Sequence, residues 1–249
     1  MIELALSGVR NIRDLGGTPT FVGRSIRPDC LIRSAHLAEA TDDDLTALKR
    51  ERRLTTVIDL RTAQEIVEKP DHAEGLERLH FSIIEALMAG VTHEEEQERR
   101  EETLPDMADL YRAMMLDACG IKNFAAALRA IFAHDYTSGS ILWHCTEGKD
   151  RCGMTTALVL EALGVDRAVI LEDYLLTNRV NRPKAEALYR EALVEKGEAY
   201  AKSVYHAFLA EERYIRAAWD AMGKDYLRGA LGIQEEEIEA FRNKVLTDR

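Results

Sequence analysis

The sequence predicts an α/β fold with a mainly parallel central sheet, flanking helices and a helical C-terminal half. Short apolar runs at 31–33, 55–60, 79–83 and 141–143 have the length and composition of buried strands. Helical patterns separate or follow these runs, and nearly everything from residue 152 onward has a helical pattern. Strands that alternate with helices are typical of a parallel sheet, with the functional loop at the carboxyl end of a strand.

Capping and helix-breaking residues mark the expected helices in turn. Thr41 is expected to cap a helix whose first turn carries Asp42, Asp43 and Asp44, which suits the positive end of the helix dipole. Five breaking residues are expected to divide the C-terminal half into five or six helices: Gly164, Pro183, Gly197, Gly223 and Gly232. No repeat or low-complexity linker interrupts the pattern, so we expect a single domain over residues 1–249.

Composition limits the function. The 249 residues are 46% hydrophobic and carry a formal net charge of −11, which argues against nucleic acid binding and general attraction to anionic membranes. An anionic substrate would therefore need a local basic site. The four cysteines form no disulfide-scaffold pattern, and no apolar run has the length of a transmembrane helix or the character of a signal peptide. We expect a cytoplasmic protein, with export without a classical signal as the alternative.

The most informative segment is 144–151, with the sequence His-Cys-Thr-Glu-Gly-Lys-Asp-Arg. It places Cys145 six positions before Arg151, between the strand-like run at 140–143 and a helix-like run at 154–163. A loop between a strand and a helix N-terminus is an anion site, because its N–H groups can turn inward and the helix dipole adds positive charge. We expect Cys145 to be held as a thiolate there. A thiolate, an oxyanion cradle and a fixed guanidinium are what transfer of a phosphoryl group to sulfur requires.

Three other interpretations of this loop are weaker or remain open. An ATP-binding loop would need Gly at position 143 and Ser or Thr at position 150, where this chain has Trp and Asp. A zinc site is not indicated, because His144, Cys145 and Cys152 have no accepted ligand spacing. A sulfurtransferase also uses a cysteine in a loop after a strand and stays an alternative, although Arg151 favours phosphate.

Beyond the loop, the chain resembles the bacterial atypical protein-tyrosine phosphatase family. Five segments carry the resemblance: the loop itself, 11–17 (Asn-Ile-Arg-Asp-Leu-Gly-Gly), 57–61 (Val-Ile-Asp-Leu-Arg) with Glu65, 173–178 (Asp-Tyr-Leu-Leu-Thr-Asn), and 231–233 (Leu-Gly-Ile) with Phe241-Arg242. They cover the chain from 11 to about 245, except a stretch around 85–104. The resemblance implies a protein-tyrosine-phosphatase-like fold and activity on phosphotyrosine, sometimes phosphoserine or phosphothreonine, and often phosphoinositides.

The polar stretch at 91–104 has two interpretations. Its composition is typical of a solvated helix. The resemblance instead suggests a helical lid, inserted at about 85–118 over the phosphate site. Five apolar residues at helical spacing follow the stretch and favour core packing, although Met-rich faces also suit adaptable lids: Met107, Leu110, Tyr111, Met114 and Met115.

The residues of the loop have expected roles. Cys145 would attack phosphorus to form a phosphocysteine, and Arg151 would bind the equatorial oxygens. The expected phosphate-binding positions are Thr146, Glu147, Gly148, Lys149, Asp150 and Arg151. The resemblance implies Asp150 as the general acid that protonates the leaving group. Asp106, Asp109 and Asp117 are upstream alternatives that could equally be exposed helix residues.

Other residues are expected to support the loop. His144 would orient it by hydrogen bonding, and Arg13, Asp14, Asp59 and Arg61, which lie in the family motifs, would buttress it through ion pairs. Lys149 is expected at the rim, where it would hold further phosphates of a phosphoinositide or screen Asp150 and Glu147.

Two positions depart from the family pattern. Cys152 stands where related loops have Ser or Thr, so hydrolysis of the phosphocysteine would be slower. Its thiol could also form a disulfide with an oxidised Cys145, unless it is only a small buried filler. Glu147 replaces a residue that is commonly small, and its charge would disfavour highly anionic substrates unless Lys149 neutralises it.

Together these observations predict a phosphatase that needs no metal or other cofactor and releases inorganic phosphate. The expected substrate is a phosphotyrosine protein or a phosphoinositide. A catalytically weak phosphate-binding module is the alternative from another functional class, which Cys152 and Glu147 make plausible.

Overall fold

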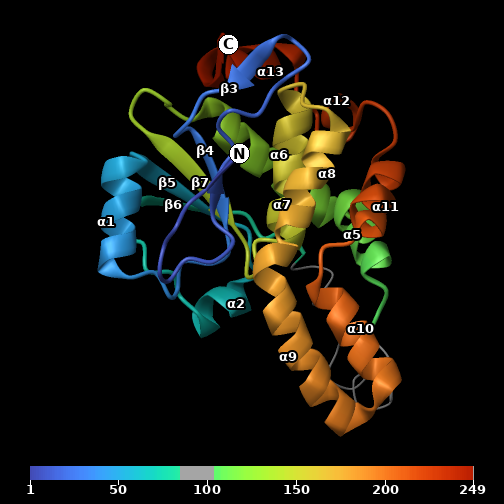
Figure 1. Ribbon diagram of the computed structural model, residues 1–249. Helices are drawn as coiled ribbons and strands as arrows, with labels where there is room; N and C mark the ends of the chain where they lie inside the picture. Colours follow the sequence, from blue (N-terminus) through green and yellow to red (C-terminus); the bar gives the residue numbers. More distant parts are fainter. Residues whose placement is uncertain (85–103, 249) are drawn as a thin grey trace.

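The computed structural model describes residues 1–84 and 104–248, and in that part of the chain a six-stranded sheet runs in the order β1-β2-β4-β7-β5-β6 (Figure 1). The strands are β1 (Ile2–Glu3), β2 (Arg13–Asp14), β4 (Leu31–Ser34), β5 (Leu54–Asp59), β6 (Glu77–His80) and β7 (Ser140–His144). The three pairs β4–β7, β7–β5 and β5–β6 are parallel, and β1 and β2 add an antiparallel edge. The predicted α/β fold with a mainly parallel sheet is confirmed.

The four strands predicted from apolar runs all exist, with β6 beginning two residues earlier than expected. The sequence did not indicate the short strands β1 and β2, nor the separate two-stranded sheet of β3 (Arg24–Ile26) and β8 (Leu246–Asp248). Strands of two or three residues are too short to show an alternating pattern. They form by pairing with other segments: β2 pairs with both β1 and β4, and β3 pairs with β8.

Helices cover the two faces of the sheet unequally (Figure 1). Helix α1 (Asp42–Glu51) lies on one face above a small hydrophobic core. The larger core, on the other face, includes residues of α5 (Met107–Leu116), α6 (Ala118–Ala133), α7 (Asp150–Ala162), α8 (Arg167–Leu176), α11 (Glu212–Met222), α12 (Tyr226–Gly229) and α13 (Glu235–Val245). The short helix α2 (Ala63–Glu68) follows β5 at the carboxyl edge of the sheet.

Local capping explains where two of these helices begin. Thr41 and Asp44 form a capping box at the start of α1, so the predicted cap is confirmed. Thr62 and Glu65 form the same motif at the start of α2.

The C-terminal half is helical, as expected, but it has seven helices between residues 150 and 245 and not the expected five or six. The expected break at Pro183 is wrong, because α9 (Asn178–Lys196) runs through it. Proline removes one amide hydrogen bond near the start of this helix. Packing of α9 against α10 (Glu198–Phe208) around a small apolar cluster offsets that loss. The α9–α10 pair extends away from the sheet (Figure 1).

The predicted lid at about 85–118 lies partly outside the described residues, as does most of the polar stretch at 91–104. The described part of this segment includes helix α5, which packs into the larger core. Tyr111, Met114 and Met115 are fully buried there. Core packing of these residues, one of the two interpretations, is therefore confirmed. Among the described helices, none has the length and apolar character needed to span a membrane.

Candidate active site

The loop between β7 and α7 lies at the carboxyl edge of the sheet, flanked by the ends of β4 and β5. Its turn depends on Gly148, which has a φ of +66°. A Cβ at this position would lie 2.6 Å from the Ser34 carbonyl oxygen, so a larger residue would push the loop off β4. The predicted order of strand, tight loop and helix N-terminus is confirmed.

Cys145 is the first residue of the loop and is only 2% exposed. Behind the loop, two buried guanidiniums face one carboxylate. Arg13 Nε donates to Asp173 Oδ1 at 2.6 Å, and Arg33 Nη1 donates to Asp173 Oδ2 at 2.5 Å. Burial alone would raise the pKa of Asp173, but the two arginines hold it below its usual value. Arg33 also donates to the Gly148 carbonyl at 2.6 Å, so a surplus positive charge lies next to the loop and favours an anion there.

Asn11 fixes the loop from the N-terminal segment. Its Nδ2 group donates to the carbonyls of Glu147 and Gly148, both at 3.0 Å, and its Oδ1 accepts from Arg13 at 2.6 Å. Carbonyls held outward in this way leave the loop N–H groups free to turn inward.

Arg151 is held by Glu65 of α2. Its two terminal nitrogens donate to the two carboxylate oxygens at 2.5 and 2.7 Å, and Nη2 also donates to Thr146 Oγ1 at 3.2 Å. Burial would raise the pKa of Glu65, but the hydrogen bonds and charge of Arg151 lower it far below its usual range. The sequence indicated Glu65 only as part of a family motif, so its contact with Arg151 is a site feature that the prediction missed.

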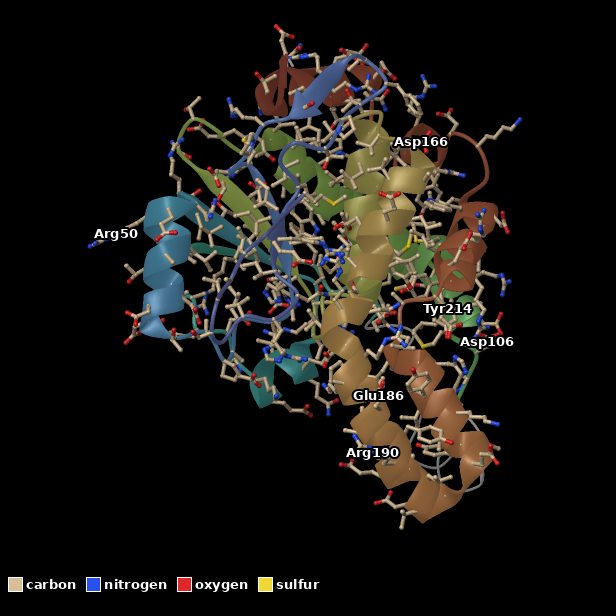
Figure 2. All side chains as sticks on the ribbon, in the orientation of Figure 1. Arg50, Asp106, Asp166, Glu186, Arg190 and Tyr214 are labelled. Carbon is tan, nitrogen blue, oxygen red and sulfur yellow. The ribbon has the colours of Figure 1, made fainter. Side chains whose placement is uncertain are left out.

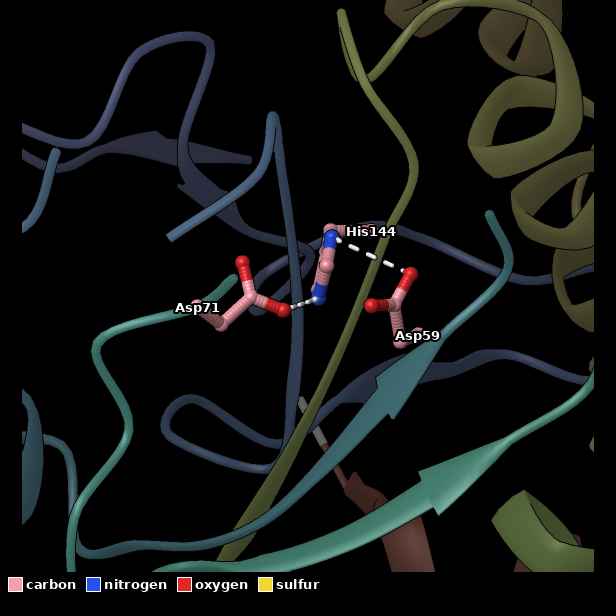
Figure 3. A group of neighbouring side chains, drawn as sticks. All are labelled: Asp59, Asp71 and His144. Carbon is pink, nitrogen blue, oxygen red and sulfur yellow. Dashed lines mark ion pairs between the residues drawn. The ribbon is translucent and has the colours of Figure 1, made fainter. Parts of the chain in front are cut away.

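His144 joins β7 to a buried network of ionisable side chains (Figure 3). Its Nε2 lies 3.1 Å from Asp71 Oδ2, and its Nδ1 lies 3.9 Å from Asp59 Oδ1. Burial alone would lower the pKa of His144, but Asp71 and Asp59 raise it above its usual value. Arg61 donates to both carboxylates, at 2.7 Å to Asp59 and 2.8 Å to Asp71. Asp71 was not among the predicted residues.

The ligand atoms of Asp59, Asp71 and His144 lie within 4.8 Å of one another, a spacing that could also hold a metal ion. The guanidinium of Arg61 already forms ion pairs with the carboxylates of Asp59 and Asp71. A divalent cation would have to displace that ion pair and would face its positive charge. The group fits a structural ion network better than a metal site.

Asp150, the predicted general acid, begins α7 and is 25% exposed. Its Oδ1 accepts a hydrogen bond from the Tyr111 hydroxyl at 2.7 Å. The three upstream candidates have other contacts. Asp106 caps α5 and pairs with Arg213 of α11. Figure 2 labels Asp106.

The other two upstream candidates also contact groups outside the loop. Asp109 pairs with Arg112 on the surface of α5. Asp117 caps α6, accepting from the Cys119 amide at 2.8 Å. No polar contact of these three carboxylates with the loop occurs among the described residues, which leaves Asp150 as the candidate that the geometry favours.

Lys149 does not lie at the rim, and this is a correction. Its side chain is 2% exposed, and its ammonium donates to the carbonyls of Ala207 and Leu209 at the end of α10, the latter at 3.2 Å. A buried ammonium group needs hydrogen-bond acceptors, and the carbonyls at the C-terminal end of α10 supply them. The backbone of Lys149 remains a predicted part of the cradle.

Glu147 is neutralised by two cations that the sequence did not indicate. Its carboxylate pairs with Arg10 at 3.1 Å and with Lys184 at 2.5 Å. These partners hold the pKa of Glu147 below its usual value despite its burial. The expectation that Lys149 would screen this charge is wrong, because Lys149 points toward α10.

Cys152 is fully buried one position after Arg151, and burial raises the pKa of its thiol to about 11. Its Sγ lies 3.6 Å from the Trp143 carbonyl oxygen, where it can donate. All four cysteines are free thiols in the structure. A disulfide between Cys152 and Cys145 stays a prediction.

Asp14 does not buttress the loop. Its carboxylate accepts from the backbone amides of Gly16 and Asp29, both at 2.8 Å, and so shapes a turn next to β2. The motif that contains it therefore divides into Asn11 and Arg13, which contact the loop or its buried partner Asp173, and Asp14, which holds the adjacent turn.

A cysteine that begins a loop between a strand and a helix N-terminus, with a fixed arginine at the end of that loop, is typical of cysteine-based phosphatases. The model of the tyrosine phosphatase family matches residues 4–247, and the chain belongs to this family. The resemblance drawn from the sequence is confirmed, and with it cysteine-based phosphatase activity.

Matches to known relatives cover most of the chain. A protein assigned as a tyrosine-protein phosphatase in Cupriavidus necator is 32% identical over 95% of this chain and 86% of its own. The triple specificity protein phosphatase PtpB of Mycobacterium tuberculosis is 30% identical over 70% of this chain and 68% of its own. Among solved structures, the core catalytic domain of the PP-IP phosphatase SIW14 of S. cerevisiae aligns at 14% identity with a TM-score of 0.39, over 77% of this chain and 88% of that one.

Proposed function

We propose that the protein, as a single domain over residues 1–249, hydrolyses phosphomonoesters through a phosphocysteine at Cys145. The pairing of Arg151 with Glu65 carries this proposal. It holds a guanidinium in one orientation at the end of the loop that Cys145 begins. Three of the five guanidinium N–H groups contact Glu65 and Thr146, and the remaining two can donate to phosphoryl oxygens without reorganising as charge moves.

The reaction proceeds in two displacements. The Cys145 thiolate attacks phosphorus, the bond to the leaving oxygen breaks, and Asp150 gives that oxygen a proton. Asp150, now a carboxylate, takes a proton from water, which attacks the phosphocysteine. The sulfur–phosphorus bond breaks, inorganic phosphate leaves, and the thiolate is restored. Arg151 and the loop N–H groups stabilise the phosphoryl oxygens in both steps.

The proposed substrates are phosphotyrosine proteins or phosphoinositides. The PtpB relative is named a triple specificity protein phosphatase, which supports a protein substrate. Arg10 and Lys184 outnumber the single charge of Glu147 beside the loop, which supports an anionic substrate. The four free thiols fit a reducing cytoplasm.

A catalytically weak phosphate-binding module is the second candidate, and Cys152 favours it. A neutral buried thiol is a poorer donor than the hydroxyl that related loops have at this position, which would slow release of the phosphate from sulfur.

Phosphate release by wild type and Cys145→Ser decides between the two. The substrates would be a phosphotyrosine peptide, a phosphoserine peptide and phosphatidylinositol 3-phosphate. We expect turnover by wild type that Cys145→Ser abolishes, and the ranking of substrates separates protein from lipid. Tight phosphopeptide binding by wild type without turnover would establish the binding module instead.

A further inference from the structure

The two carboxylate oxygens of Asp150 have different surroundings. Oδ1 accepts from the Tyr111 hydroxyl at 2.7 Å and lies 3.3 Å from the Lys149 ammonium. For Oδ2, the described part of the chain provides no hydrogen bond. The hydrogen bond from Tyr111 and the short contact with the Lys149 ammonium therefore both lie at the same oxygen.

Tyr111 is itself held in a chain of hydroxyls. Its oxygen lies 2.7 Å from the Tyr174 hydroxyl of α8, and both tyrosines are buried. Burial raises the pKa of both phenols well above the usual value, so each keeps its single proton. If Tyr111 donates to Asp150, the hydrogen bond between the two tyrosines needs the proton of Tyr174. The order of donation is then Tyr174 to Tyr111 to Asp150.

We propose that Tyr111 is a positioning residue for the general acid. By donating a hydrogen bond to Oδ1, next to the ion pair with Lys149, it directs the transferable proton to Oδ2 and fixes the orientation of the carboxyl group. Tyr111 need not touch the substrate for this effect. The inference rests on the proposed role of Asp150 and adds a residue of α5 that the loop motif does not contain.

The chemistry of the leaving group separates this role from a structural one. A poor leaving group needs nearly a full proton in the transition state, whereas an activated phenolate needs little. A misplaced acid therefore slows substrates in proportion to how basic the leaving oxygen is. A loosened core would slow all of them alike.

The experiment measures kcat for a series of substituted phenyl phosphates, from p-nitrophenyl to p-methoxyphenyl. Tyr111→Phe should lose roughly 10-fold on the least activated ester and less than about 3-fold on p-nitrophenyl phosphate, with KM nearly unchanged. Asp150→Asn should show the same trend more strongly. Tyr214→Phe is the matched control, because Tyr214 packs against the Tyr111 ring, lies on α11 (Figure 2) and directs its hydroxyl to the His206 carbonyl.

The outcomes are distinguishable. If kcat falls more steeply with leaving-group basicity in Asp150→Asn than in wild type, but follows wild type in Tyr111→Phe, the role of Tyr111 alone is overturned. If kcat of Asp150→Asn depends on leaving-group basicity no more than kcat of wild type does, Asp150 is not the acid and this inference fails with it. Loss of activity in Cys145→Ser would still support the phosphocysteine. If Tyr111→Phe does not fold, Tyr174→Phe takes its place, because it leaves the Tyr111 hydroxyl without its donor. In Tyr174→Phe, kcat should also fall more steeply with leaving-group basicity than in wild type, by a smaller factor than in Tyr111→Phe. The same dependence as in wild type would overturn the proposal.

Discussion

Glu65 joins a local motif to a distant one. Within α2 its carboxylate accepts from the Thr62 amide at 2.9 Å and completes the capping box, and the same group binds both terminal nitrogens of Arg151. The start of α2 is therefore fixed by the same side chain that orients the catalytic guanidinium. A carboxylate suits both contacts, since it offers four lone-pair directions and a full charge.

Glu65→Gln should reduce kcat/KM about 10- to 100-fold, because an amide keeps one acceptor oxygen and loses the charge-assisted pair that holds Arg151. The assay is p-nitrophenyl phosphate hydrolysis, with circular dichroism to confirm folding. Glu68→Gln is the control, because Glu68 lies on the same helix, is exposed and contacts Gln64. Activity of Glu65→Gln within about twofold of the control would contradict a role in holding Arg151.

At this scale the sequence predicts residues that act within one short segment. Cys145, Gly148 and Arg151 lie within a seven-residue segment, and their pattern between a strand-like and a helix-like run indicates an anion loop. Partners from distant segments could not be predicted, since 86 residues separate Glu65 from Arg151 and 39 separate Tyr111 from Asp150. Lys149 was misplaced for the same reason: the carbonyls that hold it belong to α10.

Elements meet at the loop because three parallel strands end there. The apolar runs of β4, β5 and β7 were long enough to predict from the sequence, and their order in the sheet brings Ser34, Asp59 and His144 to one edge. The α9–α10 pair was not predicted to contact the loop. Lys149 makes that contact through the Ala207 and Leu209 carbonyls, so the end of α10 is tied to the phosphate cradle.

Lys149→Met should loosen the end of α10, because the carbonyls of Ala207 and Leu209 lose their buried cation. Hydrogen exchange followed by mass spectrometry should show faster exchange in peptides covering 205–211. Lys202→Met is the matched control, because Lys202 lies on the same helix in an exposed pair with Glu198. Equal exchange in the two variants would show that Lys149 does not anchor this helix.

Charge is distributed unevenly over the whole molecule. The formal net charge of −11 opposes any anionic substrate at long range. Close to the loop the balance is reversed, since among the described residues Arg13 and Arg33 share the single carboxylate of Asp173, and Arg10 and Lys184 share that of Glu147. The sequence could predict that a local basic site was needed. It did not indicate Arg10, Arg33 or Lys184, because these cations come from three separate segments.

The most direct test of a phosphocysteine mechanism is to trap the intermediate. Wild type would be mixed with excess p-nitrophenyl phosphate, quenched in acid and digested, and the peptide containing Cys145 analysed by mass spectrometry. We predict one added phosphoryl group on Cys145 in wild type and none on that peptide in Cys145→Ser. Because Cys152 is a weak donor, the modified fraction should be large in the steady state. Turnover with no phosphoryl group on Cys145 at any quench time, or with the group on another residue, would contradict the mechanism.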